Sequence, residues 1–254
     1  MIYFLIMFML LIAHVFCLSG IVSDKSLSSA EVNLFEPSNG ILFGAWLNTG
    51  NQTDTPEKFN NRIQRKAAFF QFAEDFPVVF QQPFELVKNQ GTDYIIYTLF
   101  PTKFGYSEVE YRDLIQHLQE VTRITGKLFL RFGPEMNGIW KFYGQKPTQF
   151  LQLWRDIHSR IRGDSYLKDK VAFVWAPNFS RGYPYNFTSV SNDDLTILDT
   201  NRNGILDSGD DPYVPYYPGD EYVDWVGLGC QHIISEQVFR GLITPVPLPM
   251  HGNN

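Results

Sequence analysis

The sequence has little cysteine and no excess of positive charge. Its 254 residues include two cysteines, Cys17 and Cys230, and carry a formal net charge of -6. Cys17 lies in an apolar amino-terminal segment that we expect to be removed, so no disulfide is expected within the remaining chain. A protein that binds along the phosphate backbone of a nucleic acid needs a positively charged surface, and the negative net charge counts against one. We therefore expect no nucleic-acid partner.

Several motifs of common enzyme classes are also missing from the sequence. It contains neither G-x-G-x-x-G nor G-x-x-x-x-G-K-[ST], and it has no H-E-x-x-H and no G-x-S-x-G. These absences count against a dinucleotide or P-loop site, a zinc protease helix and a serine hydrolase elbow. Two of the five histidines, His117 and His158, fall within segments with helical patterns, and we expect both to be exposed.

The amino-terminal segment is uncharged and strongly apolar. Residues 1–16 contain no charged side chain, and Cys17-Leu18-Ser19-Gly20 supply small residues where a signal peptidase would cut. We expect residues 1–20 to be a secretory signal, with an uncleaved membrane anchor as the alternative. Glycosylation sequons at Asn51, Asn178 and Asn186 agree with a secreted, extracellular protein. Residues 21–254 then form one domain.

Apolar runs and helical patterns alternate along this domain. The runs are rich in aromatic and β-branched residues and lie at 41–46, 67–73, 94–100, 127–132, 171–175 and 222–229. Near-continuous runs of this kind are typical of strands buried on both faces of a parallel sheet. Between them, a capping box of Ser107 and Glu110 opens a helix that ends at Gly126, and a second helix opens at Pro147 and stops before Gly163. The pattern indicates an α/β protein, either a closed barrel or an open doubly wound sheet. The missing Gly-rich phosphate turn favours a TIM (β/α)8-type barrel, with about six of its eight β/α units present.

The fourth apolar run and the polar, Gly-containing loop after it carry four candidate site residues. Arg131 and Glu135 would lie at the carboxyl end of a barrel strand, where active sites of this fold form. A carboxyl group among apolar neighbours can act as a general acid for a leaving oxygen. Asn137 could hydrogen-bond a sugar hydroxyl or the carboxyl group, and Trp140 could stack on a sugar ring. The alternative is a purely structural pair of Glu135 with Arg131.

Residues 199–210 match the spacing of a calcium-binding loop. The oxygen ligands would come from Asp199, Asn201, Asn203, the main chain of Ile205, Asp207 and Asp210, with Gly204 at the turn. Because prolines follow instead of a second helix, the loop resembles a dockerin-type insertion. We expect Ca²⁺ to bind there as a structural clamp, with a metal-free acidic turn as the alternative.

Several blocks of the chain together resemble glycoside hydrolase family 26, the β-mannanase family, and especially its fungal-type members. The blocks are RFGPEMNGIW, YGQKPTQFLQLWRDI, VAFVWAPN and YYPGDEYVDWVGL, in this order within residues 40–230. The resemblance implies a (β/α)8 barrel that cleaves β-linked polysaccharide with retention of configuration. It implies that Glu135 is the general acid/base and that Arg131, Asn137, Trp140 and Trp175 line the sugar site.

The sequence departs from this family at two places. Pro134 stands where many family mannanases have a histidine before the acid/base glutamate, which bears on mannan specificity. The family's nucleophilic glutamate follows the seventh strand, whereas this chain ends after its sixth apolar run. Glu236 follows that run too closely for a crossover helix and is a poor candidate nucleophile. We therefore expect a domain truncated at its carboxyl end.

Three functions remain open at the level of sequence. The first is a secreted, monomeric endo-hydrolase of β-1,4-mannan with Glu135 as acid/base and no catalytic cofactor. The second is a non-catalytic carbohydrate-binding remnant that lacks the nucleophile. The third is a β-glucanase or xylanase of the same fold. All three take a polysaccharide as partner, and the first two differ in whether a second carboxylate completes the site.

Overall fold

The part of the chain that the structure describes contains six strands. The computed structural model describes residues 34–47, 54–78, 82–88, 90–179 and 190–228. Strands β1 (Gly44–Trp46), β2 (Phe69–Phe76), β3 (Tyr94–Pro101), β4 (Lys127–Phe132), β5 (Val171–Trp175) and β6 (Trp225–Val226) coincide with the six apolar runs. The predicted strands are thus confirmed, although the last one is shorter than expected.

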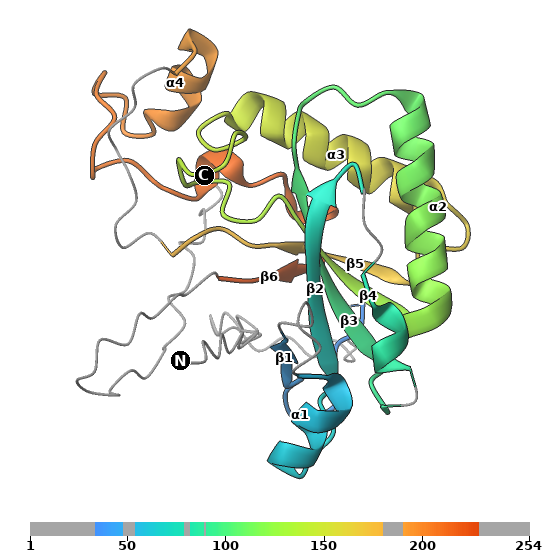
Figure 1. The fold of residues 1–254 in the computed structure, drawn as a ribbon. Coiled ribbons are helices and arrows are strands. Elements are labelled where there is room, and N and C mark those ends of the chain that lie inside the picture. Colours follow the sequence, from blue (N-terminus) through green and yellow to red (C-terminus); the bar gives the residue numbers. More distant parts are fainter. Residues whose placement is uncertain (1–33, 48–53, 79–81, 89, 180–189, 229–254) are drawn as a thin grey trace, which may run out of the picture.

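The strands form one parallel sheet whose spatial order follows the sequence, from β1 to β6 (Figure 1). Each strand pairs in parallel with the next one, and Thr98 of β3, for example, is in register with Arg131 of β4. A doubly wound sheet reverses its strand order at a switch point, whereas a barrel does not. The order without reversal therefore shows a partial barrel of six parallel strands, and the eight-unit count stays a prediction.

The two faces of the sheet bury different sets of side chains. On β3, Ile95, Tyr97 and Leu99 belong to the large core that also contains the apolar faces of the helices. Ile96 points to the opposite face, where it joins a smaller cluster with Phe129 and Trp225. This alternation is the period of two expected for strands buried on both faces. The smaller cluster occupies the side that a barrel would enclose.

Two long helices, α2 (Glu108–Thr125) and α3 (Pro147–Gly163), cover the same face of the sheet (Figure 1). The predicted capping box is present, because the Ser107 hydroxyl accepts the Glu110 N–H and the Glu110 carboxylate accepts the Ser107 N–H. Shorter elements are α1 (Pro56–Ile63), α4 (Asn192–Leu198) and the 3-10 turns at Phe84–Val87, Val214–Tyr216 and Asp220–Tyr222. No helix within the described ranges is long and apolar enough to cross a membrane.

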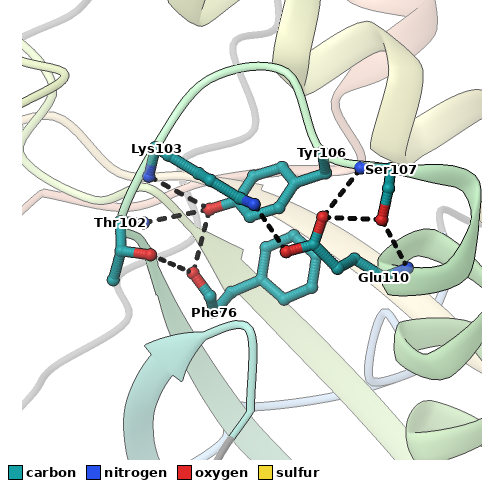
Figure 2. A network of polar contacts seen from close by, with 6 residues as sticks. All are labelled: Phe76, Thr102, Lys103, Tyr106, Ser107 and Glu110. Atoms are coloured by element: carbon teal, nitrogen blue, oxygen red, sulfur yellow. Dashed lines mark hydrogen bonds and ion pairs between the residues drawn. The ribbon is translucent and has the colours of Figure 1, made fainter.

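A hydrogen-bonded clasp joins the carboxyl ends of β2 and β3 to the start of α2 (Figure 2). The Tyr106 hydroxyl donates to the carbonyl of Phe76 at 2.9 Å and accepts the N–H of Thr102 at 3.0 Å. The Lys103 ammonium pairs with the Glu110 carboxylate at 2.6 Å. These contacts satisfy loop main-chain groups that would otherwise have no partner, and they fix the edge of the sheet beside the loop that follows β4.

The two histidines predicted to be exposed do not lie free on the helix surfaces. His158 of α3 is 8% exposed, and its ring lies 4.8 Å from that of Phe173 and 5.1 Å from that of Tyr222. His117 of α2 is partly buried and its Nε2 lies 2.7 Å from the Tyr97 hydroxyl. The prediction was wrong because both residues fall on helix faces that pack against the sheet.

Candidate active site

The loop that follows β4 folds into a tight turn anchored to both neighbouring strands. Gly133 and Glu135 both have positive φ, at 50° and 59°. The Gly133 N–H donates to the carbonyl of Leu99 at 2.9 Å, and the Glu135 N–H donates to the carbonyl of Ala176 at 2.8 Å. A left-handed conformation is unfavourable for a residue with a side chain, so these bonds are what hold Glu135 in place. The turn presents Glu135 at the carboxyl end of the sheet, as the sequence predicts.

The Glu135 carboxyl group is held by the indole of Trp140. The Trp140 Nε1–H donates to Glu135 Oε2 at 2.8 Å. Trp140 itself is 49% exposed, so one part of its surface faces solvent while its N–H is engaged with the carboxyl group. An exposed indole beside a carboxyl group is suited to stacking on a sugar ring.

Arg131 and Tyr143 lie buried behind the carboxyl group. Arg131 is 7% exposed, and its burial lowers the pKa of the guanidinium to about 10, against the opposing effect of the Glu135 charge. Arg131 therefore remains positively charged at neutral pH. Tyr143 is fully buried and donates its hydroxyl hydrogen to the carbonyl of Pro134 at 2.9 Å. Burial raises the pKa of the Tyr143 phenol, so it stays a neutral donor.

Asn137 has a structural partner that the sequence did not reveal. Its side chain is fully buried, its Nδ2 donates to the carbonyl of Asn178 at 3.0 Å, and its Oδ1 accepts the N–H of Asn178 at 2.8 Å. The amide thus joins the loop after β4 to the loop after β5. Both of its polar ends are used within the protein, so the structure gives Asn137 a positioning role instead of the expected bond to the carboxyl group.

Trp175 does not lie on the inner face of the sheet. Its side chain is 1% exposed and belongs to the core shared with the helices. Its Nε1–H donates to the carbonyl of Tyr216 at 2.9 Å, and its ring packs edge-on against Tyr217. The expectation that Trp175 lines the cleft is corrected, because alternation along β5 turns Val171, Phe173 and Trp175 toward the helices.

The predicted calcium loop is closed by its own hydrogen bonds. The Asp199 carboxylate accepts the N–H of Gly204 at 2.8 Å, and Gly204 has φ of 82°. Asp210 is 6% exposed and accepts the N–H groups of Thr200 and Asp207 at 2.8 and 2.9 Å. Within the described ranges, no three acidic, histidine or cysteine side chains converge on a position that could hold a metal ion. Asn201 and Asn203 supply further oxygens of the kind that calcium prefers.

Several predictions fall outside the residues that the structure describes. These are the signal segment 1–20, the sequons at Asn51 and Asn186, Cys230, and the candidate nucleophile Glu236. They stay predictions.

The structure adds three residues that the sequence did not single out. The Tyr143 hydroxyl stabilises the turn by donating to the carbonyl of Pro134, and Gly138 leaves room for the Trp140 ring. Asp75 lies one residue before the end of β2, and its negative charge contributes to the raised pKa of the Tyr143 phenol. Only Gly138 had a sequence signal, since glycine is favoured where another group must approach the backbone closely.

Solved structures that match this chain include two glycoside hydrolase family 26 proteins, at low sequence identity. No family model matches the chain, and no curated protein matches it. The structure of GH26A from a Muricauda species is 17% identical with a TM-score of 0.44, and the match covers 73% of this chain and 65% of that one. A modular endo-β-1,4-mannanase from Cellulomonas fimi, a glycoside hydrolase family 26 protein, is 17% identical with a TM-score of 0.39. That match covers 64% of this chain and 41% of the mannanase. This chain thus matches less than two thirds of either protein, and its fold class rests on its own strand order.

Proposed function

We propose that this protein is a glycoside hydrolase that cleaves β-1,4-mannan internally with retention, and that Glu135 is its general acid/base. The observation that carries the proposal is the constellation at the carboxyl end of β4. It consists of a carboxyl group on a rigid turn, a half-exposed tryptophan bonded to it, and a buried arginine behind it. The family resemblance of the EMNGIW block supports the same role.

The chemistry follows from these three side chains. Glu135, when protonated, would give its proton to the bridging oxygen of the polysaccharide and later accept one from water. The exposed face of Trp140 would stack on a sugar ring, and the positive charge of Arg131 would stabilise the carboxylate that forms. Retention also needs a second carboxylate about 5–5.5 Å away as nucleophile. After the sixth apolar run the sequence offers only Glu236, which is a poor candidate for this group.

Substitution of Glu135 tests this proposal directly. We expect Glu135→Gln to lower turnover of mannan by about 10²–10⁴-fold, because the amide cannot donate an acid proton. Glu120→Gln, an exposed glutamate on α2, is the matched control and should leave turnover unchanged. Release of reducing ends from mannan, β-glucan and xylan measures both the activity and the substrate.

The same assay separates the rival functions. Hydrolysis of β-glucan or xylan in place of mannan would change the substrate and keep the role of Glu135. Retention of the protein on insoluble mannan without any release of sugar would indicate a carbohydrate-binding remnant. Full activity of Glu135→Gln would contradict the catalytic role.

We also propose that residues 199–210 bind Ca²⁺ as a structural clamp. The turn at Gly204 and the hydrogen bond from the Gly204 N–H to the Asp199 carboxylate support the proposal. A calcium loop needs such a turn at its sixth position. Calcium at about tenfold its Kd should raise Tm by about 3–6 °C, and a chelator should reverse the rise. Asp199→Asn should weaken the effect. An unchanged Tm in calcium would contradict the site.

We propose a secreted, extracellular location, supported by the apolar segment 1–20 and the sequons. Sequencing the amino terminus of the protein exported from a eukaryotic host tests it. A start near residue 20 or 21 is expected, and an intact Met1 on membrane-bound protein would indicate the anchor.

A further inference from the structure

The hydrogen bond between Trp140 and Glu135 assigns different tasks to the two carboxyl oxygens. We propose that Trp140 is a positioning residue whose indole N–H occupies Glu135 Oε2, so that the acid proton resides on Oε1 and faces the leaving oxygen. The inference rests on the proposed acid/base function of Glu135. It adds the identity of the carboxyl oxygen that transfers the proton.

The geometry of the turn makes the indole and the carboxyl group one unit. The Trp140 Nε1 lies 2.8 Å from Glu135 Oε2, and the Gly138 N–H donates to the Glu135 carbonyl at 2.9 Å. A Cβ atom at Gly138 would lie 2.3–2.5 Å from three atoms of the Trp140 ring. Such distances are far below van der Waals contact, so only glycine at position 138 lets the indole fold back over the turn.

The donor and acceptor chemistry then decides where the proton sits. An indole N–H is a donor only, and a protonated carboxyl group has one oxygen that donates and one that only accepts. The carbonyl oxygen of a carboxylic acid is a stronger acceptor than its hydroxyl oxygen, so an indole N–H on Oε2 favours the proton on Oε1.

In the reaction, Oε1–H gives its proton to the bridging oxygen, which keeps the electron pair of the breaking C–O bond. The sugar carbon bonds to the carboxylate nucleophile of a retaining enzyme. Glu135 is left as a carboxylate, whose Oε2 still accepts the indole hydrogen.

Two variants break the bond in different ways. Trp140→Phe removes the N–H and keeps an aromatic ring, whereas Gly138→Ala keeps the indole and displaces it. We expect each to lower kcat/KM on mannan about tenfold, the loss that follows from one hydrogen bond to a charged group. Neither should much affect a mannooligosaccharide with a dinitrophenyl leaving group, because that group departs without a proton.

The matched control is Trp154→Phe, which removes an indole N–H bonded to the carbonyl of Tyr222 at 3.1 Å, within the core. It should leave the ratio of kcat/KM on the two substrates unchanged. Equal losses on both substrates in Trp140→Phe would show that the ring serves sugar binding alone and would overturn the inference. Unchanged kcat/KM in both variants would overturn it as well.

The hydrogen bond can also be tested without turnover. In Glu135→Ala the indole proton resonance of Trp140 should move upfield, while that of Trp154 should stay in place. If the wild-type protein hydrolyses no polysaccharide, the proposed function fails, and this resonance alone decides whether Trp140 holds the carboxyl group. An unmoved Trp140 resonance would overturn the inference even in an active enzyme.

Discussion

At the scale of single residues, the unusual backbone of Glu135 is the feature on which the site depends. A left-handed conformation costs an L-residue about 1–2 kcal/mol, and Glu135 adopts it with φ of 59°. Three bonds compensate, made by the carbonyl of Ala176, the N–H of Gly138 and the hydroxyl of Tyr143. The conformation of Glu135 therefore depends on hydrogen bonds that do not involve its carboxyl group.

Tyr143 allows a direct test of this support. We expect Tyr143→Phe to lower the free energy of unfolding by about 1–3 kcal/mol, because the buried carbonyl of Pro134 loses its donor. Urea denaturation measures the loss. Tyr166→Phe is the control, since Tyr166 is only partly buried and keeps its ring contacts with Arg123 and Lys170. Equal stability of the two variants would show that the Tyr143 hydroxyl contributes nothing.

A second residue-scale prediction concerns His158. Burial, together with the nearby charge of Arg162, lowers the pKa of His158, while Asp224 and Glu221 oppose the shift. The unfolded chain then binds more protons than the folded one as pH falls below the ordinary histidine value of about 6.5. Stability should therefore decrease from pH 7 toward pH 5. In His158→Phe the decrease should be shallower, as Tm measured against pH will show, and an identical slope would refute the assignment.

At the scale of elements, α2 is defined by its amino-terminal cap and by the clasp beside it. Ser107 and Glu110 close the capping box, and Lys103 joins it from the loop. These contacts hold the pKa of Glu110 down to about 2, with the Lys103 ammonium as the largest cause. The carboxylate thus keeps its partners across the physiological range of pH.

We expect Ser107→Ala to lower the free energy of unfolding by about 1 kcal/mol, because the N–H of Glu110 loses its acceptor. Urea denaturation measures it. Ser159→Ala, an exposed position inside α3, should be neutral or slightly stabilising, since alanine is the better helix former. A loss in the second variant as large as in the first would argue against a capping effect.

At the scale of the whole molecule, the smaller core cluster links segments that are far apart in the sequence. Phe129 of β4 packs edge-on against Phe35 at 5.4 Å and Trp225 at 5.1 Å, and tilted against Tyr94 at 5.5 Å. The Trp225 Nε1–H also donates to the carbonyl of Leu34 at 2.7 Å. The two ends of the described chain therefore meet on the inner face of the sheet.

Phe129→Ala should lower the free energy of unfolding by about 3–5 kcal/mol, because it opens a cavity shared by these rings. Ile139→Ala, at an exposed position in the site loop, should change stability by less than about 0.5 kcal/mol. Thermal unfolding of both variants measures the contrast. A small loss for Phe129→Ala would mean that the inner cluster is not a tightly packed core.

Much of the architecture could be predicted from the sequence. The six strands, the helices α2 and α3, and the capping box are confirmed, because buried strands and amphipathic helices impose local patterns that survive in any tertiary context. The strand-end position of Glu135 is confirmed as well. The sequence could not predict which face of the sheet each side chain of β5 occupies, since a strand buried on both sides is apolar at every position.

The sequence by itself determined the order of the elements and the placement of a carboxyl group at the end of the fourth strand. Tertiary structure alone decided which side chains reach that group. The Trp175 side chain packs on the helix side of the sheet, and the Asn137 amide binds the main chain of the loop after β5. The Trp140 ring lies against Gly138, and its N–H donates to Glu135. The physical reason is that local patterns follow hydrophobic periodicity. Partners of polar atoms depend instead on how segments far apart in the chain come together.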